Sequence, residues 1–289
     1  VALFERLARN PRWAAAAYCG MGWQLEAQRP EDAFAAAKKS LAAQPFVENL
    51  SLQRTLALNW FGDLELARQA AEKISSADLR DQDGVALGVM WLYWSRREPR
   101  EMLQLLNAIP RQWLQANAWA QRWPKDYWVG IAHDMNDDRR AAIRAWRSAL
   151  TLLDQQQEDA GHAARSRALK AELQVRLGDL SAEAVVDSFR KNGETVPRTV
   201  SILRRDFDAV RSGLEKLRWA VLRYSPEFDP LRDDPRFQAL LAEAEKDPKR
   251  SPHAKVSSAA QPAMDFADAK SKSVAVLAFE NLSGDKENE

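Results

Sequence analysis

Residues 137–150 decide the fold, and they read DDRRAAIRAWRSAL. An acidic pair opens the stretch, and Ala142, Trp146 and Ala149 then follow at intervals of four and three residues. This is the period of a helix with one buried face, and acidic residues suit the positive end of such a helix. The stretch therefore predicts a helix that begins after Asp137-Asp138.

The same pattern recurs three times upstream, in residues 31–45, 62–73 and 97–110. Each segment has a counterpart to Ala142 near its start, and these counterparts are Ala33, Ala67 and Met102. Successive positions are 34, 35 and 40 residues apart. A fixed interval of this length indicates a repeat built from helix pairs, and the longer last interval predicts an insertion around residues 111–123.

Glycine and proline are scarce in residues 1–245, which are rich in strong helix formers and are expected to be nearly all helical. Beyond residue 155 the repeat weakens. Further helices are expected at residues 169–177, 184–189, 199–208 and 211–224. Asp234-Pro235 then predicts a last short helix to about Glu245, because Asp is a good N-cap and Pro suits the first turn.

These segments resemble the second helices of tetratricopeptide (TPR) repeats, and Val129-Gly130 resembles the Leu-Gly position of a first helix. Met102 departs from the small residue that is usual in the family. The resemblance implies an all-α fold, a right-handed superhelical solenoid of antiparallel helix pairs. The small residues have a physical purpose, because helices approach to about 8–10 Å only where contact positions are small or interdigitate.

The C-terminal part reads as three further segments. Residues 226–241 resemble the closing segment that follows TPR arrays in bacterial signalling proteins, so residues 1–245 are expected to form an array with a capping helix. Residues 246–272 have the composition of a flexible linker. Residues 273–289 contain a β-branched run and resemble the first strand and loop of a TolB-like amino-terminal domain. The chain is accordingly expected to be a piece of a larger bacterial protein.

Composition argues against several classes of protein. Lys+Arg 42 against Asp+Glu 41 gives a net charge of +1, which does not suit a general nucleic-acid binder. No apolar run approaches the roughly 20 residues that span a bilayer, so no membrane insertion is expected from this segment. Cys19 is the single cysteine, and we expect it to be a packed apolar residue. A cytoplasmic location is favoured, while a periplasmic location or an anchor elsewhere in the protein stays open.

The eleven tryptophans have two interpretations, packing between helices or a groove for a partner. Aromatic residues dominate binding hot spots. Because first helices line the concave face in TPR proteins, the resemblance implies a peptide groove lined by Gln53, Asn59, Trp60, Trp91, Trp94, Tyr127 and Asp134. The first helices of the expected repeats do not carry the Lys, Asn and Arg set with which some TPR proteins grip a C-terminal carboxylate.

No catalytic constellation is visible in the sequence. His133, His162 and His253 have no metal-binding spacing, and the glycines form no phosphate loop. We therefore expect no catalytic residue, cofactor or metal, and a protein–protein interaction scaffold within a larger signalling or regulatory protein. The alternatives are a regulatory fragment of a serine/threonine kinase or adenylate cyclase, of a winged-helix transcriptional regulator, or of a periplasmic or envelope assembly factor.

Overall fold

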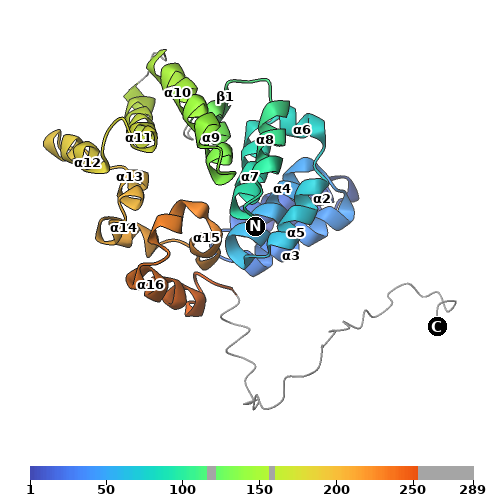
Figure 1. Cartoon of the computed structure of the whole chain (residues 1–289). Helices are drawn as coiled ribbons and strands as arrows, with labels where there is room; N and C mark the ends of the chain where they lie inside the picture. Colours follow the sequence, from blue (N-terminus) through green and yellow to red (C-terminus); the bar gives the residue numbers. More distant parts are fainter. Residues whose placement is uncertain (116–121, 156–159, 253–289) are drawn as a thin grey trace, which may run out of the picture.

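The computed structural model describes residues 1–115, 122–155 and 160–252, and this part of the chain is mostly helical, as the sequence predicts (Figure 1). The expected TolB-like strand at residues 273–289 and most of the expected linker lie outside the described residues.

The first half of the chain folds into consecutive helices joined by short connections. They are α1 (Ala2–Ala8), α2 (Pro11–Leu25), α3 (Pro30–Ala43), α4 (Val47–Leu56), the π-helical turn η1 (Ala57–Phe61), α5 (Leu64–Glu72), α6 (Ser76–Asp81), α7 (Asp83–Ser95), α8 (Pro99–Ala108), α9 (Lys125–Met135) and α10 (Arg139–Gln155). Neighbours pack in pairs, α2 with α3, α4 with α5, α7 with α8 and α9 with α10. The four helices predicted from the repeat are therefore present as α3, α5, α8 and α10.

The second half consists of shorter helices. They are α11 (Ala160–Leu177), α12 (Ala182–Lys191), α13 (Arg198–Leu203), α14 (Phe207–Leu214), α15 (Trp219–Tyr224), the 3-10 turn η2 (Pro226–Leu231) and α16 (Pro235–Lys246). As predicted, Asp234 caps α16, since its carboxylate accepts a hydrogen bond from the Arg236 backbone N–H. The expected helices at 199–208 and 211–224 are wrong in their bounds, because three helices occupy this stretch.

The repeat positions lie where the helices of each pair meet. Ala33, Ala67, Met102 and Ala142 are all 0% exposed. The best-matching pair shows why small residues are needed there. A Cβ on Gly130 would lie 2.2 Å from Cδ1 of Trp146, so the ring packs directly on the backbone of α9. The interval of the sequence pattern thus marks true packing positions.

One turn geometry closes the first helix of most pairs. The last residue of the turn has a positive φ at Gly62, Arg97, Asp137, Gly178 and Arg205. The next residue is acidic at all five turns. At four of them its backbone N–H donates to the carbonyl five residues back, and these carbonyls belong to Tyr93, His133, Gln174 and Ser201. This is the Schellman arrangement for ending a helix. At the first turn Asp63 bonds six residues back to Ala57, because η1 holds one extra residue.

This turn explains the wrong helix bounds at residues 199–208. Arg205 adopts φ 61, and the Asp206 carboxylate accepts a hydrogen bond from the Ala209 N–H to cap α14. An arginine in a left-handed conformation has no sequence signal comparable to glycine. The expected single helix is consequently broken into α13 and α14.

The predicted insertion is a small β-hairpin. Strand β1 (Trp113–Gln115) pairs antiparallel with β2 (Arg122–Pro124), and Leu114 lies opposite Trp123. Asp83 at the start of α7 holds the first strand, because its carboxylate accepts hydrogen bonds from the Arg111 guanidinium and the Gln115 N–H. Among the described residues, these two strands are the departure from an all-helical structure.

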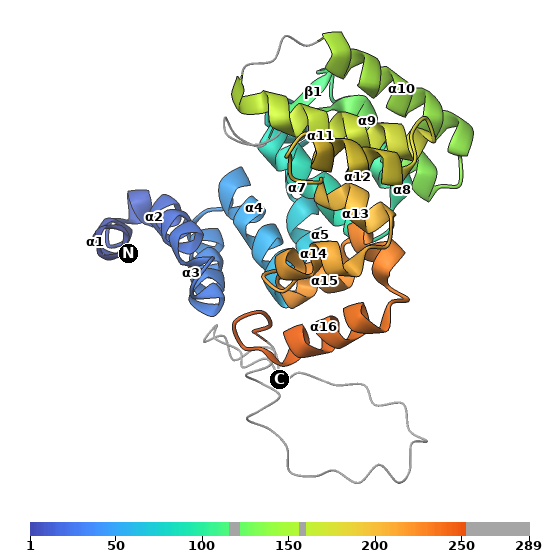
Figure 2. The same ribbon diagram turned by 90° about the vertical axis from the view of Figure 1, so that its left-hand side faces the viewer.

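The chain curves back on itself, so that α15 packs against η1 (Figures 1 and 2). Arg218, just before α15, lies 3.8 Å from the centroid of the Trp60 ring and 3.3 Å from a Glu26 oxygen. Arg97 donates two hydrogen bonds to the Asp229 carboxylate. These contacts join the C-terminal helices to the first pairs, and we call this junction the closure.

The ordered chain continues past the expected end of the array at residue 245. The Trp219 N–H donates to the Arg250 carbonyl at 3.0 Å, and the Arg250 guanidinium donates to the Leu217 carbonyl at 2.8 Å. Ser251 is buried. Arg250 and Ser251 are therefore packed against the C-terminal helices, beyond the end of α16.

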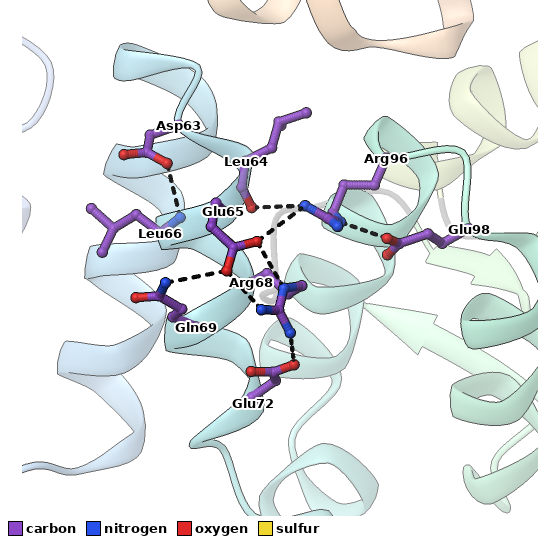
Figure 3. A network of polar contacts seen from close by, with 9 residues as sticks. All are labelled: Asp63, Leu64, Glu65, Leu66, Arg68, Gln69, Glu72, Arg96 and Glu98. Carbon is purple, nitrogen blue, oxygen red and sulfur yellow. Dashed lines mark hydrogen bonds and ion pairs between the residues drawn. The ribbon is translucent and has the colours of Figure 1, made fainter. Parts of the chain in front are cut away.

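A polar network fixes α5 relative to the turn after α7 (Figure 3). Arg96 donates to the Glu98 carboxylate at 2.7 Å and to the Leu64 carbonyl at 3.3 Å. Along α5, hydrogen bonds from Arg68 lower the pKa of Glu65 to about 2. Exposed ion pairs of this kind contribute little to the free energy of folding. The network therefore orients the two elements more than it stabilises them.

Candidate functional site

Two adjoining cavities lie between the first helices of the pairs and the C-terminal helices, and Trp91 on α7 lines both. The first has a volume of about 330 Å³ and lies at the closure, so we call it the closure cavity. Its walls come from α4, η1, α7 and α15. They are Arg54, Thr55, Leu58, Asn59, Gly88, Trp91, Ser95, Ala220, Val221, Tyr224 and Ser225.

The second cavity has a volume of about 220 Å³, and we call it the tryptophan cavity. Its lining comes from α7, β2, α9, α11, α13 and η2. It consists of Trp91, Trp94, Trp123, Tyr127, Trp128, Ala168, Leu169, Glu172, Arg176, Arg198, Thr199 and Glu227. Elements far apart in the sequence thus build one aromatic pocket.

Trp128 is the centre of the aromatic wall. The ring centroids of Trp91, Trp94 and Trp123 lie 5.5, 5.6 and 6.0 Å from it. Trp91 and Trp94 meet edge-on at 4.8 Å. Inclined contacts at these distances are favourable, because the positive edge of one ring meets the negative face of the next. The wall is therefore closely packed, and of these four rings only the half-buried Trp91 lines both cavities.

A buried carboxylate lines the tryptophan cavity and is paired with two neighbouring side chains. Glu172 is 3% exposed, and its Oε1 accepts hydrogen bonds from the Tyr127 hydroxyl at 2.9 Å and from Arg176 Nε at 2.8 Å. Burial, and then the neighbouring Glu172 charge, raise the pKa of Tyr127 well above its ordinary value. The phenol therefore stays protonated and serves as a fixed hydrogen-bond donor.

A second acid lines the opposite side of this cavity. Arg198 on α13 donates to the Glu227 carboxylate of η2 at 2.9 Å. Burial raises the pKa of Glu227, although the Arg198 charge acts in the opposite direction. The cavity thus contains two carboxylates and two guanidinium groups, and its formal charge is balanced.

Arg54, which lines the closure cavity, has no carboxylate beside it in the described part of the chain to balance its charge. Arg54 is 6% exposed. Its guanidinium donates hydrogen bonds to the Gly88 carbonyl at 2.7 Å and to Thr55 Oγ1 at 3.1 Å. Its Nε has no hydrogen-bond partner, and no carboxylate pairs with it among the described residues. Burial lowers the pKa of Arg54 to about 10. A buried and unpaired guanidinium is an energetically costly group.

Gly88 makes room for this guanidinium. A Cβ at Gly88 would lie 2.1 Å from Nη2 of Arg54, so any larger residue would displace the charge. Ser225 lines the same cavity, and its hydroxyl is also buried and lacks a partner among the described residues. Two unpaired polar groups therefore line one cavity.

The structure brings together four of the seven residues predicted for a groove. Asn59 and Trp91 line the closure cavity, and Trp91, Trp94 and Tyr127 line the tryptophan cavity. Trp94 and Tyr127 are 7% and 6% exposed, which makes them part of the core as well as of the cavity wall. The two interpretations of the tryptophans thus apply to the same side chains.

Gln53, Trp60 and Asp134 line neither cavity. The Trp60 ring is buried below Arg218, and its Nε1 donates to Glu26 at 2.9 Å. The extra residue of the π-helical turn η1 shifts the positions that follow it around the helix axis, so that Leu58 and Asn59 face the cavity instead. Asp134 forms an ion pair with Arg139 at 3.0 Å, in the turn between α9 and α10.

The sequence reasoning missed Arg54 and Glu172. A faint signal exists for both, because Arg54 follows Leu50 by four residues and Glu172 follows Leu169 by three, at positions where an apolar residue is expected. A charged residue at a core position of a helical pattern indicates a buried polar contact. Arg176 carries the same signal, three residues after Leu173, whereas Arg198, Ser225 and Glu227 carry none.

The remaining side chains with reactive groups are packed in the core or lie beside a charged neighbour. Burial raises the pKa of Cys19 to about 11, so that its thiol is protonated and packs as an apolar group. His133 lies 3.8 Å from the Asp138 carboxylate. The part of the chain that the structure describes holds no cluster of three or more His, Cys, Asp or Glu that could bind a metal ion. Within that same part, no helix has the length and apolar character needed to cross a membrane.

The arrangement can bind through its cavities, one of them neutral and aromatic and the other containing an unpaired positive charge. Comparisons of the chain with models of protein families, with curated proteins and with solved structures found no match.

Proposed function

We propose that this chain is a non-catalytic interaction scaffold that binds a peptide segment of a partner protein along the surface between the two cavities. The repeated helix pairs and their fully buried small positions support the interpretation as a TPR-like solenoid within a bacterial signalling or regulatory protein. In that interpretation α4, α7 and α9 are the first helices, and they carry the residues that line the cavities.

The observation that carries the proposal is the position of Trp91. Its half-buried indole lies between an aromatic pocket and a second cavity, each large enough for a side chain. Protein interfaces obtain most of their binding free energy from a few aromatic and arginine residues that meet a partner in such pockets. A peptide lying across Trp91 could place one side chain in each cavity.

The test uses variants that fill the cavities without removing core side chains. Ser95→Phe adds a ring to the closure cavity, and Thr199→Phe adds one to the tryptophan cavity. Ser188→Phe on the exposed face of α12 is the control. Each full-length chain would be used to capture partners from a bacterial lysate, with recovery read by mass spectrometry.

A protein recovered by the wild type and by Ser188→Phe, but lost with both cavity variants, would support the proposal. Equal recovery by all four chains would contradict it. Circular dichroism spectra and melting temperatures of the variants are the control, because they separate a loss of binding from a loss of folding.

A further inference from the structure

The closure cavity holds two groups that the fold leaves unpaired. Arg54 and Ser225 line the cavity, and the buried atoms Arg54 Nε and Ser225 Oγ have no hydrogen-bond partner among the described residues. Arg54 comes from α4, whereas Ser225 follows α15, so the two groups meet only because the chain closes. Folding rarely leaves buried polar groups unsatisfied, and each one is costly. A ligand that accepts hydrogen bonds from both would remove this cost.

The charge of the cavity selects the kind of ligand. Arg54 is the only charged residue among those that line it. A single guanidinium matches a monoanion, and its planar fork of N–H groups fits the two oxygens of a carboxylate. A phosphate ester carries nearly two charges and would leave one uncompensated.

The guanidinium also borders a second hollow, lined among others by Glu48 and Asp83. An anion there would meet two carboxylates, and Asp83 already accepts a hydrogen bond from Arg111. The closure cavity contains no acidic residue. An anion is therefore favoured on the closure side of Arg54.

The remainder of the wall is apolar and partly aromatic. Leu58, Trp91, Val221 and Tyr224 surround the space next to Arg54. Its volume of about 330 Å³ is at the small end of the range, about 300–1,000 Å³, that small-molecule sites occupy. The body of the ligand should therefore be small and apolar.

We propose that the closure cavity binds a small organic monocarboxylate, whose carboxylate accepts hydrogen bonds from Arg54 and Ser225 and whose apolar body lies against Trp91 and Tyr224. This site shares the closure cavity with the proposed peptide surface, so the two occupants would compete for it, but the monocarboxylate requires no partner protein. Because its walls come from α4, α7 and α15, a bound ligand holds the C-terminal helices against the first pairs.

The experiment uses the full chain and three probes, phenylacetate, hexanoate and indole-3-acetate, each compared with its neutral amide. Binding is measured by the shift in melting temperature and by quenching of tryptophan fluorescence. At least one carboxylate should raise the melting temperature of the wild type, and its amide should not. The variant Arg54→Met, which keeps an unbranched apolar stem without the guanidinium, should bind that carboxylate about tenfold more weakly or worse, because a charged hydrogen bond is lost.

Two further variants make the result specific. Val221→Phe fills the cavity and should abolish binding, while Arg223→Ala, on an exposed position of α15, should leave it unchanged. If Arg54→Met does not fold, the contrast between Val221→Phe and Arg223→Ala decides the question. An octapeptide that ends in Phe, tested with and without a C-terminal amide, separates a free carboxylate from the C-terminus of a peptide.

The proposal is overturned if no probe carboxylate binds the wild type. It is also overturned if acid and amide bind equally, or if Val221→Phe binds as well as the wild type. Binding of the octapeptide acid in preference to the three small acids would replace the small molecule with a peptide C-terminus.

Discussion

Gly130 lets the Trp146 ring pack directly on the backbone of α9, in the helix pair that best matches the repeat. The Trp146 ring occupies the space where a Cβ would be, and Trp146 itself is 0% exposed. A methyl group at this position must displace the ring or separate the two helices, since closely packed cores do not absorb extra atoms without strain.

Gly130→Ala should therefore lower the free energy of unfolding by about 1–3 kcal/mol. Gly213→Ala in α14 is the matched control, because its added Cβ would meet no atom within 4 Å. This control should be neutral or raise stability by up to about 1 kcal/mol, through the better helix propensity of alanine. Urea unfolding followed by circular dichroism measures both, and equal effects would contradict the packing argument.

Glu227 should make stability depend on pH. Burial raises its pKa, so the folded protein retains the proton at a pH where the unfolded chain has released it. Stability from this group is thus fully present below its ordinary pKa of about 4.3 and is lost as pH rises through the folded pKa. Glu227→Gln, which cannot ionise, should gain stability over the wild type as the pH is raised from about 4 to about 7.

The measurement is the difference in free energy of unfolding between the two chains at several pH values. Each unit of pKa displacement corresponds to about 1.4 kcal/mol. A difference that stays constant, or that changes in favour of the wild type, would show that the Arg198 ion pair outweighs burial.

At the scale of elements, the turns between paired helices combine a left-handed residue with an acidic cap. Asp137 has φ 57 and is exposed, whereas the Asp138 carboxylate accepts a hydrogen bond from the Ala141 N–H. Neighbouring aspartates therefore have opposite effects on the same turn. One bears the conformational cost of a left-handed L-residue, and the other satisfies an N–H at the helix start.

Asp137→Gly should raise the free energy of unfolding by up to about 1 kcal/mol, since glycine adopts this conformation without strain. Asp138→Ala should lower it by about 1 kcal/mol through loss of the cap. Chemical denaturation of the two variants beside the wild type tests the pair. Changes of the same sign would mean that the turn is not organised in this way.

The elements show how far sequence reasoning extends. Repeat spacing predicted α3, α5, α8 and α10, because it reports the packing of Ala33, Ala67, Met102 and Ala142. The helix bounds from α13 to α15 were predicted wrongly, and at the first break the cause is Arg205, which acts through its backbone conformation. Local patterns thus give the helices that obey a repeat and miss breaks made by residues without a strong conformational preference.

At the scale of the whole molecule, the site is predictable only in part, because its cavities form when distant parts of the chain come together. Trp91, Trp94 and Tyr127 follow from the aromatic content of the first helices. Arg54 and Ser225 are 171 residues apart in the sequence and meet only through closure of the chain. No short-range pattern encodes that meeting.

Closure itself should depend on Arg218, whose guanidinium lies between Trp60 and Glu26. Arg218→Ala should cost on the order of 1–2 kcal/mol, mainly through the cation–π contact in a partly desolvated position. Amide exchange should accelerate in α15 and η1 while α9 and α10 keep their protection. Arg223→Ala, which changes an exposed arginine within α15, should alter neither property.

Hydrogen exchange with mass spectrometry resolves these segments. Uniform acceleration across the chain would indicate that the closure is part of one cooperative unit with the first pairs. Unchanged exchange in α15 would show that Arg218 does not hold it.

The contact of α15 with η1 also limits the number of helix pairs that lie between them. Repeat arrays in which each unit meets only its neighbours can grow when a stretch of the gene is duplicated, because an added unit disturbs little. Here an additional helix pair would carry α15 away from the helix on which it rests (Figure 1). Duplication should therefore be selected against in this lineage, and related chains should differ in length at connections such as the β-hairpin rather than in their number of pairs.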